Sequence, residues 1–172
     1  MNVICRAMTA DDYDDVRKLW MSITGFGIRK IDDSREEIER FLQRNPTTSV
    51  VAQLSHKTEN PGKIVGAILC GSDGRQGYLY HVCVLSEYRR QGIGRQMVSY
   101  CMHALADLKI NRVALIAFAK NDVGNAFWRQ IGWNGRSDCN YYDFVLNEEN
   151  IVSFIRPVEK TPASTGGEMN LN

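Results

Sequence analysis

The chain has 172 residues, of which 44% are hydrophobic and 24% charged, and its formal net charge is +1. A charge balance so close to neutral gives no overall attraction to nucleic acid or to an anionic membrane surface, so we expect neither as a partner. No apolar run approaches the roughly 20 residues of a membrane-spanning helix, and the length suits one domain with its own core.

The five cysteines are scattered along the chain and none forms a C-x-x-C pair. Three of them, Cys70, Cys83 and Cys101, lie in apolar stretches. We therefore expect buried free thiols in a reducing compartment rather than disulfides or a metal site. The pattern predicts a cytoplasmic protein that needs no metal.

The first half of the chain predicts two helices between short strands. A strand is expected at residues 2–8, and apolar residues at three- and four-residue spacing predict a helix over 13–23. Ser34 and Glu37 form a capping box that begins a second helix, which ends at Asn45–Pro46. Three strands are then expected at 47–54, 62–71 and 78–85, the last of them buried on both faces.

The second half alternates helices and strands. An apolar stripe predicts a helix over 93–108, followed by an apolar strand at 112–120 and a short helix that Gly132 ends. A final strand is expected at 140–146, "NYYDFVL". After Arg156 the sequence is rich in proline, glycine and small polar residues, so we expect a domain at 1–156 and a disordered tail at 157–172.

This order of elements predicts an α/β fold with a mixed sheet. Two strands separated by a helix imply a parallel pair with a right-handed crossover. The earlier strands are joined by short turns and should be antiparallel. No internal repeat is found in the sequence.

The stretch "RRQGIGRQMV", residues 89–98, places two glycines and three arginines around the start of the helix expected at 93–108. Glycine lets the backbone approach a ligand closely, and the first turn of a helix attracts anions. The stretch therefore predicts a phosphate-binding loop. A Walker loop is excluded because no Gly-Lys-Ser/Thr occurs, and a dinucleotide fingerprint is excluded because Met97 stands where its third glycine belongs.

The remaining pattern is R-x-x-G-x-G, from Arg89 to Gly94, and "NDVGNAFWRQIGW" follows about thirty residues later. Together the two segments resemble the GNAT superfamily of acyl-CoA-dependent N-acetyltransferases, and the resemblance covers roughly residues 3–147. It implies a mixed central sheet of six to seven strands, flanked by about four helices, with a splayed parallel pair at its centre. It also implies transfer of an acetyl group from acetyl-CoA to a primary amine, by direct attack on the thioester.

The resemblance implies that the glycine loop holds the pyrophosphate of coenzyme A and that the pantetheine arm enters between the splayed strands. Gly124 departs from the family's alanine and Trp128 from its tyrosine. The resemblance thus implies that coenzyme A is bound by Val82, Cys83, Val84, Arg89, Arg90, Gln91, Gly92, Ile93, Gly94, Arg95, Asn121, Phe127 and Trp128.

Catalysis of amine acetylation needs a general base, because a lysine-like amine has a pKa of about 10.4 and must be neutral to attack. His81, directly before the expected pantetheine site, is either this base or a core histidine. Tyr80 should point to the opposite face and pack or line the substrate site. The family's tyrosine commonly protonates the leaving thiolate, which an indole N–H cannot do. Tyr142 or Tyr141 is the expected substitute, with unassisted departure as the alternative.

The loop between the first two helices, "ITGFGIRKIDDS", is where the family usually shapes its acceptor pocket. It mixes both signs of charge, so the acceptor stays open between a small-molecule amine and a protein amine. A non-catalytic acyl-CoA-binding regulatory module is the alternative function. A homodimer is compatible with the sequence.

Overall fold

The computed structural model describes residues 3–55 and 59–156. The expected tail at 157–172 lies outside the described residues. Within these ranges the helices and strands follow one another in this order: β1 (Val3–Ala7), η1 (Ala10–Asp12), α1 (Tyr13–Met21), β2 (Gly27–Arg29), α2 (Arg35–Arg44), β3 (Val50–Leu54), β4 (Ile64–Ser72), β5 (Gly77–Val84), η2 (Ser86–Tyr88), α3 (Ile93–Asp107), β6 (Val113–Leu115), α4 (Asp122–Gln130) and β7 (Val152–Phe154).

Five strands form the main sheet in the order β1-β3-β4-β5-β6. The pairs from β1 to β5 are antiparallel, while β5 and β6, which are joined through α3, run parallel. The expected mixed α/β sheet with a parallel pair is therefore confirmed. Short turns and one helical crossover account for these directions.

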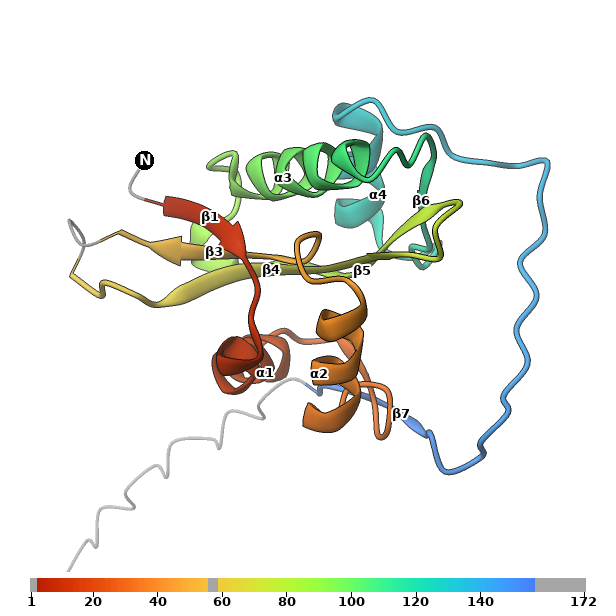
Figure 1. The fold of residues 1–172 in the computed structure, drawn as a ribbon, viewed down its shortest axis with the longest axis horizontal. Helices are drawn as coiled ribbons and strands as arrows, with labels where there is room; N and C mark the ends of the chain where they lie inside the picture. The colour runs from red at the N-terminus through yellow and green to blue at the C-terminus, as the bar shows by residue number, and fades with distance from the viewer. Residues whose placement is uncertain (1–2, 56–58, 157–172) are drawn as a thin grey trace, which may run out of the picture.

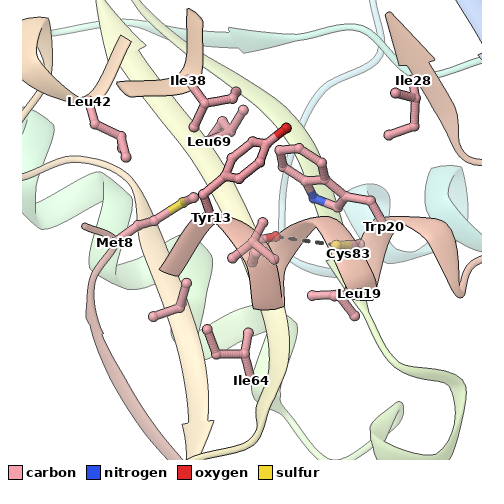
Figure 2. Packing of buried hydrophobic residues seen from close by; sticks show 13 residues of the cluster. Met8, Tyr13, Leu19, Trp20, Ile28, Ile38, Leu42, Ile64, Leu69 and Cys83 are labelled. Carbon is pink, nitrogen blue, oxygen red and sulfur yellow. Dashed lines mark hydrogen bonds between the residues drawn. The ribbon is translucent and has the colours of Figure 1, made fainter. Parts of the chain in front are cut away.

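The helices cover both faces of this sheet. Figure 1 shows α3 and α4 on one face and α1 and α2 on the other. Each face has its own apolar core. On one face Met97, Cys101 and Leu105 of α3 are buried against the sheet. On the other face Tyr13 and Trp20 of α1 are buried against it. Figure 2 shows these two α1 side chains lying over the strands. The dashed line in the same view is the hydrogen bond that the Cys83 thiol donates to the Ala67 carbonyl.

Local signals explain where the helices begin and end. The Ser34 hydroxyl accepts a hydrogen bond from the Glu37 amide, so α2 begins where the capping box predicts. Gly132 follows the C-cap of α4 with a φ of +91°, a conformation that glycine adopts without strain. Cys70, Cys83 and Cys101 are buried free thiols, as their apolar contexts predict.

The C-terminal part of the domain differs from the sequence expectation. Residues 140–146 are not a strand, and their large apolar side chains are exposed. Strand β7 lies further along the chain and pairs antiparallel with β2 in a separate two-stranded sheet. In the described residues the main sheet has five strands, fewer than the expected six to seven, because β2 and β7 pair apart from it. Among the described strands none lies beyond β6, so the parallel pair is at the edge of this sheet and not at its centre.

The reason is the context of the segment. Figure 1 shows residues 134–149 running in a wide arc outside the two layers. A high β-propensity forms a strand only where a partner strand and a packing surface are present. Strand β6 is likewise shorter than the expected 112–120, because its pairing with β5 ends at Leu115. Within the described residues, no helix is long and apolar enough to cross a membrane.

Candidate active site

The glycine loop leads from β5 into α3. Arg90 and Gly92 both have left-handed backbones, with φ of +57° and +80°. Gly92 is the N-cap of α3, and its carbonyl accepts the first hydrogen bond of the helix from Gln96. The amides of the first turn, from Ile93 on, therefore precede the helical hydrogen-bond ladder and are oriented to bind an anion.

The two glycines of the loop have different roles. A Cβ on Gly92 would meet nothing within 4 Å, so this position needs glycine for its φ of +80°. A Cβ on Gly94 would lie 3.2 Å from the ring of Phe127. Gly94 therefore allows α4 to pack closely against the first turn of α3, in addition to any role in ligand approach.

The side chains of the loop are exposed, apart from Ile93, which anchors the helix in the core. The Arg89 guanidinium donates through Nε to the Val84 carbonyl at 2.9 Å and so ties the loop to the end of β5. Gln91 donates to the Glu87 carbonyl. The ion pairs within the described ranges do not include Arg90 or Arg95, whose charges face solvent.

Strands β5 and β6 separate directly beside this loop. Their parallel register ends at the Leu79–Leu115 pair. Strand β5 continues to Val84, paired only with β4. The opposite edge of residues 80–84 is therefore not paired to a strand in the described sheet. This is the expected splay, and it puts the backbone of Val82, Cys83 and Val84 at the opening.

Cys83 contributes only its backbone to that edge. Its thiol is buried and donates to the Ala67 carbonyl at 3.8 Å. Burial raises the pKa of the Cys83 thiol to about 12. The side chain is therefore a core thiol and no nucleophile at neutral pH.

A β-bulge interrupts β5 at His81. The register moves from Ala67–Cys83 to Leu69–Tyr80, so two residues of β5, His81 and Val82, lie opposite one residue of β4. His81 has a φ of +51° at this bulge. As a result Tyr80 contacts Phe41, and His81 contacts Trp20 and Phe26. The expectation that Tyr80 and His81 point to opposite faces is wrong, because the bulge turns both toward the layer of α1 and α2.

The His81 ring lies in a defined aromatic and acidic environment. Its centroid is 4.8 Å from that of Trp20 and 5.0 Å from that of Phe26. Its Nε2 is 2.6 Å from Oδ1 of Asp33, a residue that is 3% exposed. The ring itself is about one-fifth exposed, so it remains accessible from solvent.

A tyrosine pair lies next to His81. Tyr78 and Tyr80 stack with their centroids 4.9 Å apart, and Tyr80 is 47% exposed. The expected burial of β5 on both faces is therefore wrong. Partial burial, followed by electrostatic interaction with neighbouring groups that include Tyr141, raises the pKa of both hydroxyls. Both phenols are therefore neutral at pH 7 and present polar, uncharged aromatic surface.

Helix α4 supplies the aromatic wall near α3. Asn121 is its N-cap and accepts a hydrogen bond from the Gly124 amide at 3.0 Å. A Cβ at Gly124 would lie 2.5 Å from the side-chain nitrogen Nδ2 of Asn121, so any larger residue would displace the capping side chain. Phe127, Trp128 and Trp133 form a continuous aromatic row with centroids 5.0 Å apart.

Tyr142 is 85% exposed and lies in the arc at 134–149, not on a strand. Its role as an acid stays a prediction. The sequence also did not predict the hydrogen-bond partners of the loop between α1 and α2. Asp33 gives no signal in the sequence beyond its place before the capping Ser34. Asn150 accepts hydrogen bonds from the amides of Ile31 and Asp32, and such a contact across the chain leaves no local pattern.

A comparison with known proteins adds to this geometry. A family model described as "Acetyltransferase (GNAT) family" matches residues 13–133. An acetyltransferase of Sodalis glossinidius is 29% identical over 118 residues, which cover 69% of this chain and 78% of that protein.

Solved structures are similar in fold at low sequence identity. The NatC complex bound to Gag peptide and CoA matches with a TM-score of 0.64 at 18% identity, covering 77% of this chain and 84% of that chain. AAC(6')-Iy in complex with a bisubstrate analog, CoA-S-monomethyl-acetylneamine, matches with a TM-score of 0.62 at 14% identity, covering 84% and 99%.

Proposed function

Because the chain belongs to the acetyltransferase (GNAT) family and is an acetyl-CoA-dependent N-acetyltransferase, we propose that it acetylates a primary amine beside the bulge of β5. The proposal depends on one juxtaposition. The helix terminus that suits a pyrophosphate, the open edge of β5 and an acid-paired histidine follow one another within residues 81–95.

The coenzyme would be held by backbone and charge together. The first-turn amides of α3 would bind the pyrophosphate, aided by the solvent-facing charges of Arg90 and Arg95. Arg89, Gln91 and Ile93 shape the loop, and Asn121, Phe127 and Trp128 form the α4 wall beside it. The left-handed Gly92, with open space around its Cβ position, fits the close approach of a phosphate.

The sheet edge would hold the arm and the reacting carbonyl. When bound, acetyl-CoA supplies an acetyl thioester whose carbonyl oxygen becomes negatively charged during attack. Backbone groups of Val82, Cys83 and Val84 would pair with the arm, and one N–H there would donate to that oxygen. Such donors are effective because they are fixed before the reaction begins.

His81 would accept the proton of the attacking amine. The bulge and the contacts with Trp20 and Phe26 fix its ring beside the opening. A positioned base of this kind contributes roughly 10²–10⁴-fold to a rate. The Trp128 indole packs between Phe127 and Trp133 and cannot act as an acid. The thiolate would receive its proton from Tyr142 instead.

The acceptor would enter on the layer of α1 and α2. Phe26, Tyr78 and Tyr80 give this side an aromatic lining, and a hollow lies between Thr24–Gly25 and residues 152–156. One structural neighbour is bound to a peptide and another to a small-molecule analogue, so both acceptor classes belong in the test.

The association of two copies of the chain into a homodimer stays a prediction.

An amine panel tests the proposal. The full chain is incubated with acetyl-CoA and either small amines or peptides with free N-termini and lysines, and products are read by mass spectrometry. We expect at least one amine to gain an acetyl group, and we expect His81→Gln to lower the rate of acetylation by roughly 10²-fold or more. Tight binding of acetyl-CoA without acetylation of any amine would instead support the non-catalytic module.

A further inference from the structure

A buried carboxylate on the loop between β2 and α2 reaches across to the β5 bulge. Asp33 is 3% exposed, and its side chain has two separate partners. Oδ2 accepts a hydrogen bond from the Arg29 amide at 2.6 Å, and Oδ1 lies 2.6 Å from Nε2 of His81. The Asp33 carbonyl also accepts from the Tyr13 hydroxyl at 2.9 Å. Both ends of the residue are therefore fixed, which leaves the carboxylate little freedom to turn away.

This contact determines which nitrogen of His81 carries the proton. An ionised carboxylate only accepts hydrogen bonds, so the imidazole must donate through Nε2–H. The neutral ring then has its lone pair on Nδ1. Without Asp33, a neutral histidine would distribute between two tautomers, of which only one presents the lone pair at a given place.

The surroundings of the ring make the choice of tautomer matter. Trp20 and Phe26 hold the ring plane at 56° and 42° to their own planes, and the backbone at His81 is in the left-handed region. The ring cannot easily rotate to exchange its two nitrogens against this packing. A wrong tautomer would therefore leave an N–H where the amine proton must go.

We propose that Asp33 is the positioning residue of His81, which it holds as the Nε2–H tautomer with Nδ1 free to accept the amine proton. The inference rests on the proposed role of His81 as base. It adds that Asp33, in the loop between α1 and α2, sets the tautomer of a histidine on the sheet. The base is thus assembled only when this loop is folded against β5.

Nitrogen-15 NMR of the full-length protein tests this directly. The chain has three histidines, and loss of one signal in His81→Gln assigns that residue. In the neutral form of His81 we expect the proton on Nε2. His103 gives an internal reference, since its Nδ1 lies 2.8 Å from the Ser99 carbonyl and should carry the proton. In the wild type, neutral His81 with its proton on Nδ1 would overturn the proposal.

Variants give the kinetic arm. Asp33→Asn should mix the two His81 tautomers and lower kcat about tenfold or more, with the KM for acetyl-CoA unchanged. Asp32→Asn is the matched control, because Asp32 is the exposed neighbour, and it should leave both unchanged. An unaltered tautomer and full kcat in Asp33→Asn would overturn the role of Asp33 alone. Full kcat in His81→Gln would remove the base itself and, with it, the proposed mechanism.

Discussion

The side-chain oxygen of Asn150 accepts a hydrogen bond from the Ile31 amide at 3.0 Å, across 119 residues of sequence. It also accepts from the Asp32 amide, while the Lys30 amide donates to the Ile151 carbonyl. These contacts hold the loop that contains Asp33. The segment at 150–155 therefore fastens the α1–α2 loop in place.

Replacing Asn150 with alanine should loosen this loop. Two backbone N–H groups lose their acceptor, so we expect the free energy of unfolding to fall by about 1 kcal/mol and kcat to fall with it. Asn147→Ala is the control, because Asn147 accepts only locally, from the Glu149 amide. Denaturant unfolding and initial rates measure both quantities. Equal behaviour of the two variants would contradict the fastening role.

The glycine loop can be tested with a matched pair of left-handed glycines. Gly92 and Gly74 have φ of +80° and +90°, and neither would meet an atom within 4 Å as alanine. Each alanine variant should lose a similar amount of stability, about 1–2 kcal/mol. Calorimetry with acetyl-CoA should show weaker binding only for Gly92→Ala. Equal coenzyme affinity in both folded variants would exclude the loop as the phosphate site.

The acid step is tested at the aromatic positions. Trp128→Phe should keep most of the turnover, because Trp128 packs against Phe127 and Trp133 and donates no proton to the thiolate. If Tyr142 is the acid, Tyr142→Phe should cost roughly 10²-fold in kcat, about 2.7 kcal/mol. Tyr141→Phe is measured beside it under the same conditions. Turnover that survives both tyrosine changes would instead indicate unassisted departure of the thiolate.

Stability at low pH should depend on Asp12. Burial alone would raise its pKa, but hydrogen bonds from Arg6 and Thr9 outweigh it and hold the pKa below its usual range. The folded state thus binds this proton less readily than the unfolded state, so the stabilisation is present above about pH 4 and is lost as the pH falls through the lowered value. Asp12→Asn should remove this part of the acid dependence, measured as melting temperature against pH. The exposed Asp11→Asn should retain it.

Most of the main sheet and all four helices follow from local signals. The capping box at Ser34 and the stripe of α3 place their helices within a residue or two. The bulge at His81 was not predictable, because the strand at 78–85 is apolar or aromatic almost throughout and shows no alternation whose phase an extra residue would shift. The β2–β7 pairing was missed for a related reason: three-residue strands distant in sequence are specified by tertiary contacts rather than by propensity.

The most direct measurement is a crystal structure of the full chain with coenzyme A. We expect the pyrophosphate on the first-turn amides of α3, next to Gly92 and Arg95. The sulfur end should lie at the open edge of β5, beside Val82–Val84 and within reach of His81. A coenzyme bound elsewhere, or one whose sulfur lies on the α3 face away from His81, would contradict the proposed site and its base.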